Sequence, residues 1–254
     1  MTDLRSIDLD ALNSATKYPS IPTYHALGEK GRLTEDAVPF SGTVHLTEKV
    51  DGTNARIAVL PGGAYVIGSR EELLYARGDV IANPALGIVD ALRAVADTLP
   101  APDTGVRVHY LEVYGGRIGG ASRQYSGTGA VSHRLFDVAD VDADVLTWPR
   151  VRISAWREEG GQRFLSEDAL AAAARGAGLD LVPRLGEVDA ALLPTGVQEM
   201  SDLLAERLPA TRVGLDDTAG GAPEGIVLRT ADRSTIAKAR FQDYRRTLKA
   251  AARR

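Results

Sequence analysis

Apolar and polar residues alternate along several short segments of the chain, which is the pattern of half-buried β-strands. These segments are rich in β-branched and aromatic residues, and turn-forming residues separate them. We therefore predict strands of an antiparallel or mixed sheet at residues 42–50, 54–60, 64–69, 105–115, 133–141 and 224–230.

Further segments carry apolar residues at helical spacing, and these lie at residues 84–99, 166–178, 197–208 and 241–252. In the second of them, Ser166 offers an N-cap before an acidic first turn, and Gly176 or Gly178 offers a C-cap. Strands and helices are interspersed without a regular βαβ rhythm. The predicted fold class is therefore α+β, with antiparallel sheets flanked by helices.

The length of 254 residues, with 44% hydrophobic residues, suits one large domain or two small ones. No repeat or linker divides the chain, so we expect a single domain over residues 1–254, with no appended C-terminal or OB domain. The glycine-rich stretches 114–130 and 216–223 are the segments most expected to be mobile.

The chain contains no cysteine, which excludes disulfides, thiolate metal sites and cysteine nucleophiles. The N-terminus is acidic and lacks an apolar signal core, and no run approaches the roughly 18 apolar residues of a membrane helix. A cytoplasmic protein without membrane association is the expectation.

The net charge of −4 argues against a protein that coats nucleic acid through a broad basic surface. Any nucleic-acid contact must be local, and residues 229–254, where basic residues far outnumber acidic ones, could supply it. Taken alone, these residues are more typical of a solvated basic terminal helix.

The stretch "EKVDGTN", residues 48–54, places Lys49 directly after an alternating segment. A lysine can act as a nucleophile only as the neutral amine, which requires desolvation or nearby positive charge. Gly52 would let the backbone turn tightly against a ligand, while Asp51 and Asn54 could orient hydroxyls or phosphate. Taken alone, the stretch is also typical of a simple hairpin turn.

Other segments carry charges where burial is expected. Glu112 and Glu224 lie in or beside apolar strands, where a carboxylate usually has a partner or a ligand. Lys238 and Arg240 alternate in "TIAKARF" and would point the same way, towards an anionic phosphate. Either glutamate alone is more typical of an edge-strand or salt-bridge residue, and the two cations alone are more typical of a solvated charge run.

As an ordered set, these segments resemble the covalent nucleotidyltransferase superfamily, and within it the RNA ligases of the RNA ligase 2 type. "EKVDGTN" resembles the adenylylation motif of that family, and Asn54 favours RNA ligases over DNA ligases and capping enzymes. The segment "KYPSIPTYH" is similar to the N-terminal signature of the family, and "VIGSREELL" to the segment with a phosphate-contacting arginine. The other motifs III, IIIa, IV and V are matched in order by "LEVYGG", "HRLFDVAD", "EGIVLRT" and "AKARF".

The resemblance implies a role for each matching residue. Lys49 would attack ATP and carry AMP, while Lys238 and Arg240 would contact the α-phosphate and lower the pKa of Lys49. The remaining cofactor-binding residues would be Glu48 at adenine, Asp51, Asn54 and Arg70 at hydroxyls or phosphate, Glu112 at a ribose hydroxyl, Phe136 stacked on adenine, and Glu224. Glu224 would also contact Mg²⁺ or Mn²⁺, since hard cations prefer carboxylates.

One departure and several alternatives follow from the same comparison. Arg240 stands where motif V usually has a second lysine, which keeps the charge but makes an acid role less expected. The expected partners are RNA ends or a nicked duplex, with an accessory protein that could supply a nucleic-acid-binding domain. The alternatives are a DNA or mixed nick-joining ligase, a ligase-like nucleotide- or RNA-binding protein that needs a partner for sealing, and a GTP-using capping enzyme.

A second set of residues is predicted to be structural. The histidines show no metal-ligand spacing, although His109 lies on a predicted strand beside Glu112. Tyr114 and Tyr125 are predicted to pack in the core. Arg117 and Arg123 could grip a nucleic-acid backbone.

Overall fold

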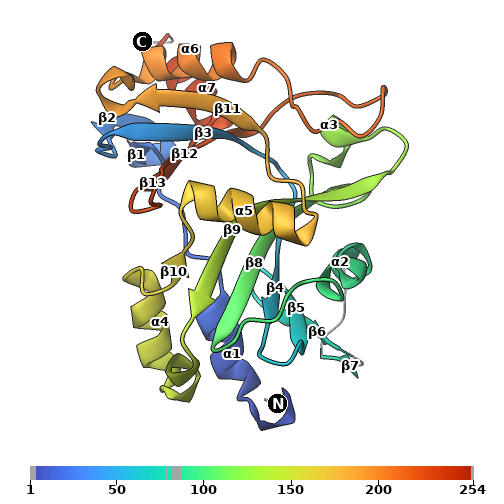
Figure 1. The fold of residues 1–254 in the computed structure, drawn as a ribbon. Coiled ribbons are helices and arrows are strands. Elements are labelled where there is room, and N and C mark those ends of the chain that lie inside the picture. Colours follow the sequence, from blue (N-terminus) through green and yellow to red (C-terminus); the bar gives the residue numbers. More distant parts are fainter. Residues whose placement is uncertain (1–3, 78, 82–86, 253–254) are drawn as a thin grey trace. The chain divides into compact units, whose positions relative to one another are not determined.

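A computed structural model describes residues 4–77, 79–81 and 87–252 (Figure 1). The described residues form two compact units. The first unit comprises residues up to 19, 52–120 and 131–181, and the second unit comprises residues 20–51, 121–130 and 182 onwards. The division falls inside "EKVDGTN", between Asp51 and Gly52. A single domain therefore stays a prediction, and each unit is described by itself.

The first unit is built on a seven-stranded antiparallel sheet in the order β10-β9-β8-β4-β5-β6-β7. Its strands are β4 (Thr53–Val59), β5 (Tyr65–Ser69), β6 (Leu73–Ala76), β7 (Asp79–Val80), β8 (Val106–Gly115), β9 (Val131–Val141) and β10 (Arg163–Phe164). Its helices are α1 (Leu9–Thr16), α2 (Ile88–Ala96), α4 (Arg150–Glu158) and α5 (Glu167–Ala177), with 3₁₀ turns η1 (Leu4–Ser6) and η4 (Ala143–Thr147).

Alternation along β4 and β8 gives this sheet two apolar faces. Ile57 and Leu111 belong to the core on one face, which α2 and α5 cover. Ala58 and Tyr110 belong to the core on the other face, which α1 and α4 cover. The unit is therefore three-layered, and each completely buried Leu or Ile contributes about 1.5–3 kcal/mol relative to exposure.

The second unit contains a four-stranded antiparallel sheet in the order β11-β3-β12-β13 and a two-stranded sheet. Its strands are β1 (His25–Leu27), β2 (Leu33–Ala37), β3 (Thr43–Lys49), β11 (Arg184–Asp189), β12 (Gly225–Thr230) and β13 (Ile236–Arg240). Its helices are α3 (Ser122–Tyr125), α6 (Val197–Arg207) and α7 (Phe241–Ala251), with η2 (Glu29–Gly31) and η5 (Ala190–Leu192).

One face of the four-stranded sheet is closed by apolar packing. Leu46 and Leu228 pack with Met200 and Leu204 of α6 and Tyr244 of α7. Because residues of opposite parity point to the other face, Thr47 and Lys49 of β3 and Lys238 and Arg240 of β13 lie away from this core, whereas Glu48 shares the parity of Leu46.

The α+β fold class and every predicted strand and helix are confirmed, with boundaries shifted by a few residues. Residues 84–86 of the predicted helix 84–99 lie outside the described residues, and α2 begins at Ile88. The structure adds short elements that the pattern did not predict, among them α1, α3, α4, β1 and β2. No described helix is long and apolar enough to cross a membrane, and a cytoplasmic location stays a prediction.

Candidate active site

Lys49 and Glu224 form an ion pair in the second unit. The Nζ of Lys49 donates to Oε2 of Glu224 over 2.5 Å, with the two side chains 26% and 12% exposed. Lys49 is the last residue of β3 and pairs in register with Gly225, the first residue of β12. The antiparallel ladder therefore brings Glu224, the residue next to Gly225, alongside the lysine.

The environment of Glu224 favours its neutral form more than water would. Burial raises the pKa of this carboxyl, and the nearby carboxylate of Asp51 raises it further, while Lys49 and Arg240 lower it. The Glu224 carboxylate can therefore either stay paired with the Lys49 amine or bind another cation in its place. Both Lys49 and Arg240 are close enough to interact with it electrostatically.

Lys238 and Arg240 share the sheet face of Lys49, as their alternation predicted. Arg240 pairs with Gly225 and Lys238 with Val227, and these two residues pair in turn with Lys49 and Thr47 of β3. The intervening residues Ala237 and Ala239 are buried in the opposite face. The second unit thus presents three cationic side chains on one face of one sheet.

Both cations of β13 open onto a groove of about 560 Å³. The groove is also lined by residues 21–23 and by the β1–β2 hairpin. Residues 22–24 are held against β13 by backbone hydrogen bonds. The amide of Lys238 donates to the carbonyl of Pro22, and the carbonyl of Lys238 accepts from the amide of Tyr24. An anionic group in this groove would meet two positive side chains and one negative side chain, Asp36.

Asp243 fixes the guanidinium of Arg240. Its carboxylate, only 1% exposed, accepts from Nε of Arg240 at 2.8 Å and from Arg246 at 2.7 Å. No motif in the sequence points to Asp243. The available signal was an acidic residue three positions after Arg240 in the first turn of a predicted helix.

Glu48 is 1% exposed, and its side chain is already engaged. One carboxylate oxygen accepts from the hydroxyl of Thr211 and the other from the amide of Arg212 at 2.9 Å. Its own amide donates to the carbonyl of Pro183. The bonds from Thr211 and Arg212 hold the segment after α6 against β3. An adenine contact by Glu48 stays a prediction.

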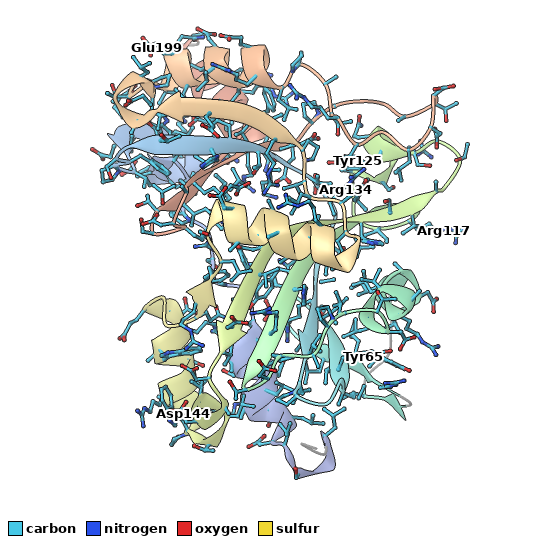
Figure 2. The ribbon with its side chains drawn as sticks, viewed as in Figure 1. Tyr65, Arg117, Tyr125, Arg134, Asp144 and Glu199 are labelled. Atoms are coloured by element: carbon cyan, nitrogen blue, oxygen red, sulfur yellow. The ribbon has the colours of Figure 1, made fainter. Side chains whose placement is uncertain are left out.

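The helix α3 contacts the chain beside both members of the Lys49–Glu224 pair. The hydroxyl of Tyr125 accepts from the amide of Asp51 at 2.6 Å. The side-chain oxygen of Gln124 accepts from the amide of Ala222 at 3.0 Å. Figure 2 labels Tyr125 on α3, and its complete burial confirms the predicted packing role. Its hydrogen bond to the motif backbone was not predicted.

Asp216 joins the two glycine-rich stretches that were predicted to be mobile. Its carboxylate accepts from the hydroxyls of Ser126, Thr128 and Thr218 at 2.6, 2.8 and 2.5 Å. The amide of Gly127 adds a bond at 3.1 Å. These bonds, the one from Ser126 first, hold the pKa of the Asp216 carboxyl far below its ordinary value. The two stretches are therefore cross-linked by hydrogen bonds.

In the first unit, Asn54 and Glu112 are direct partners across β4 and β8. Glu112 Oε1 accepts from the amide of Gly52 at 3.0 Å. The side-chain oxygen of Asn54 is buried and has no hydrogen-bond partner within the described part of the chain. A buried acceptor without a donor is costly, so this oxygen suits a ligand that brings a hydroxyl or an amine.

Arg70 lies in the turn after β5, and its side chain is 61% exposed. The backbone of this turn is held by Arg56, a completely buried residue that donates to the carbonyls of Ser69 and Arg70 and to Thr16 of α1. Burial lowers the pKa of Arg56 to about 10, which leaves it charged at neutral pH. The exposed guanidinium of Arg70 thus projects from a rigid support.

Phe136 lies on the same sheet face as Tyr110 of the first unit. Its ring stacks on Tyr110 with 6.3 Å between centroids and meets Tyr18 edge-on at 5.0 Å. The residue is only partly buried. Stacking of Phe136 on adenine stays a prediction, as do the roles of Asn54, Arg70 and Glu112.

Comparison with known proteins identifies the family. The sequence model of the family described as "RNA ligase" matches residues 42–250. The chain belongs to the RNA ligase family. The match spans the ion pair of Lys49 and Glu224 and the cations of β13. The sequence matches no curated protein at a significant level.

Solved RNA ligase structures share the fold at low sequence identity. A Naegleria gruberi RNA ligase mutant with ATP and Mn superposes with a TM-score of 0.54 at 14% identity, covering 82% of this chain and 52% of that one. An archaeal ATP-dependent RNA ligase gives 0.54 at 18% identity, covering 90% and 49%. The chain therefore spans about half the length of these RNA ligases, and the likeness establishes the fold.

The carboxylates of Glu224 and Asp51 in the second unit fit a divalent cation bound together with phosphate. No group of three or more His, Cys, Asp or Glu residues within the described ranges could hold a metal by itself. Mg²⁺ usually retains several waters and takes one or two carboxylates plus substrate phosphate oxygens. Glu224, with Asp51 close enough to affect its pKa, offers such a donor set.

Proposed function

We propose that this member of the RNA ligase family is an ATP-dependent ligase that joins 5′-phosphate and 3′-hydroxyl RNA ends through a lysyl-AMP intermediate. The observation that carries the proposal is the ion pair of Lys49 and Glu224 on the sheet face that also presents Lys238 and Arg240. A nucleophilic amine, an adjacent carboxylate and two cations are the groups that nucleotidyl transfer needs.

In the first step the lone pair of the Lys49 amine forms a bond to the α-phosphorus of ATP. The bond between that phosphorus and the oxygen bridging to the β-phosphate breaks, and pyrophosphate leaves with its electron pair. The amine must lose a proton before or during attack, and the Glu224 carboxylate, which accepts a hydrogen bond from it at 2.5 Å, can receive that proton. The product is a phosphoramide between Lys49 and AMP.

Lys238 and Arg240 are suited to stabilise the charge that develops on the α-phosphate. Both face the groove, and Arg240 is pre-oriented by Asp243, so little reorganisation is needed when the phosphate arrives. Arg240 stays protonated throughout, since arginine does not titrate near neutral pH. Its contribution is therefore electrostatic and geometric.

Glu224 and Asp51 are the residues that would hold Mg²⁺ or Mn²⁺. When bound, the cation would neutralise charge on the phosphate oxygens. Structures of two Naegleria gruberi RNA ligase mutants carry ATP and Mn, which supports the same requirement here. The remaining residues would serve ATP or the RNA end, with Asn54, Glu112 and Arg70 at hydroxyls and phosphate and Phe136 and Glu48 at adenine.

After the first step, AMP would pass from Lys49 to the 5′-phosphate of one RNA end. The 3′-hydroxyl of a second end would then attack that phosphate and release AMP. An accessory protein that adds nucleic-acid contacts is a further part of the proposal.

The decisive experiment is incubation of the purified chain with ATP labelled at the α-phosphate and Mg²⁺ or Mn²⁺. We expect a covalent label on the wild type, none on Lys49→Ala, and undiminished label on Lys30→Ala, an exposed lysine outside the motifs. Parallel reactions with GTP and NAD test the cofactor. The proposal fails if the wild type takes up no label or if Lys49→Ala takes up as much.

Sealing assays then identify the substrate. Nicks with RNA or DNA on the 3′-hydroxyl side separate an RNA ligase from a DNA or mixed ligase, because the 2′-hydroxyl distinguishes the two. A chain that labels itself but seals no nick alone is the partner-dependent alternative. Adding a cell extract and fractionating the restored sealing activity would then identify the accessory protein.

A further inference from the structure

Two consecutive residues of α3 hold the backbone on either side of the proposed reaction centre. Tyr125 holds the amide of Asp51, two residues after Lys49, and Gln124 holds the amide of Ala222, two residues before Glu224. All of these residues belong to the second unit. A short helix thus contacts both strand ends that carry the ion pair.

The position of α3 is itself fixed by many bonds. The amide of Leu215 donates to the carbonyl of Tyr125 at 2.7 Å, and the amides of Gly220 and Gly221 donate to the carbonyls of Arg123 and Gln124 at 2.8 and 3.0 Å. Asp216 closes the same connection through Ser126 and Thr128. The α3 segment and residues 215–222 therefore form one hydrogen-bonded body that leads directly into Glu224.

We propose that Tyr125 and Gln124 are positioning residues that set the distance between the Lys49 amine and the Glu224 carboxylate. This inference rests on the proposed function. Neither side chain needs to touch ATP, because each acts through a backbone amide. Loss of either hydrogen bond would let the backbone beside Lys49 or Glu224 shift. A displacement of about 1 Å can slow a reaction about 100-fold.

A set of conservative variants tests the role. Tyr125→Phe removes the acceptor and keeps the ring, whereas Gln124→Met removes the acceptor and keeps the length. Gln124→Glu retains an oxygen that can accept from Ala222. Tyr65→Phe is the matched control, since Tyr65 is 2% exposed and its hydroxyl donates to Asp97 in the first unit at 2.9 Å (labelled in Figure 2).

The first measurement is the single-turnover rate constant of lysine labelling across ATP concentrations. Tyr125→Phe and Gln124→Met should lower the rate constant at saturating ATP about 10- to 100-fold, with little change in the half-saturating ATP concentration. Gln124→Glu should recover most of the rate. Tyr65→Phe should leave the rate unchanged, whatever it does to the melting temperature.

The second measurement does not depend on activity. Amide hydrogen exchange of Asp51 should accelerate in Tyr125→Phe, and exchange of Ala222 should accelerate in Gln124→Met, while neither changes in Tyr65→Phe. The proposal is overturned if these amides exchange at wild-type rates, or if labelling falls only in proportion to lost stability, with no recovery in Gln124→Glu. A wild type that takes up no label would instead overturn the proposed function. The exchange measurement would still show whether Tyr125 and Gln124 hold the amides of Asp51 and Ala222.

Discussion

Lys49 and Glu224 are 175 positions apart in the sequence, yet their side chains meet at 2.5 Å. The contact follows from one register, in which the last residue of β3 pairs with the first residue of β12. Because Glu224 is largely buried, its charge depends on the lysine beside it. The pair is the feature of the second unit that most constrains a mechanism.

The variant Glu224→Gln should impair both the first step and its metal dependence. It removes the negative charge beside Lys49 and one carboxylate donor while keeping the shape. We expect self-labelling to slow about 100-fold and the half-maximal Mn²⁺ concentration to rise about tenfold, the range found when groups that support a metal are lost. Labelling over a Mn²⁺ titration measures both. Glu206→Gln, on the exposed face of α6, should behave as wild type, and an unchanged Mn²⁺ requirement in Glu224→Gln would exclude it as a metal contact.

The variant Asp243→Asn should destabilise the chain and slow labelling. The buried carboxylate accepts from two guanidinium groups, and an amide can replace only part of this. Loss of a charge-assisted hydrogen bond costs about 1.5–3 kcal/mol, and Arg246 is about half exposed, so we expect a loss of about 2 kcal/mol in urea unfolding. Asp202→Asn, an exposed substitution on α6, should change stability by less than about 0.5 kcal/mol. Equal unfolding midpoints for the two variants would contradict the role given to Asp243.

The variant Gly52→Ala should be poorly tolerated. A Cβ at this position would lie 2.2 Å from the carbonyl oxygen of Val113 and 2.9 Å from Cβ of Tyr114, so the backbone would have to move. We expect a loss of more than about 2 kcal/mol in unfolding free energy. Gly176→Ala is the matched control, because no atom lies within 4 Å of its added methyl in α5. That variant should gain about 0.5–1 kcal/mol. Equal effects would show that the close approach to β8 is unimportant.

Stability should fall on acidification through His109. Burial, with the nearby charge of Arg107, lowers the pKa of this imidazole to about 4, while Asp140 and a bond to the Ile57 backbone oppose the shift. The unfolded chain binds a proton near pH 6.5 and the folded chain does not until about pH 4. Stability is therefore complete above pH 6.5 and declines between 6.5 and 4, by up to about 3 kcal/mol. Urea unfolding at pH 7 and 4.5 measures the decline.

The comparison that isolates His109 uses His109→Gln, which cannot gain the proton. Its stability should depend less steeply on pH between 6.5 and 4.5 than that of the wild type, whatever its stability at pH 7. Carboxylates such as Asp216 titrate in both proteins and cancel. Identical slopes would assign the acid sensitivity to those carboxylates instead.

Short elements with weak periodicity are not predicted by the sequence, for identifiable reasons. The helix α1 has a visible N-cap, since Asp8 accepts from the amides of Asp10 and Ala11, but eight residues give little periodicity. The helix α4 buries only Ile153 among its nine residues. The strands β1 and β2 are short, and the hairpin they form is packed against β13 and α7 rather than specified by its own alternation.

Periodicity and the order of the motifs are sufficient to predict the longer strands, their faces and the family. A side-chain period of two places Lys238 and Arg240 on one face without knowledge of their neighbours. The contacts between distant segments come from the packed structure alone. They are the β3–β12 register that joins Lys49 to Glu224, the hydrogen bond between Asp243 and Arg240, and the hydrogen bond between Tyr125 and Asp51. Local periodicity cannot specify these contacts, because pairing between remote segments depends on the free energy of the complete packed unit.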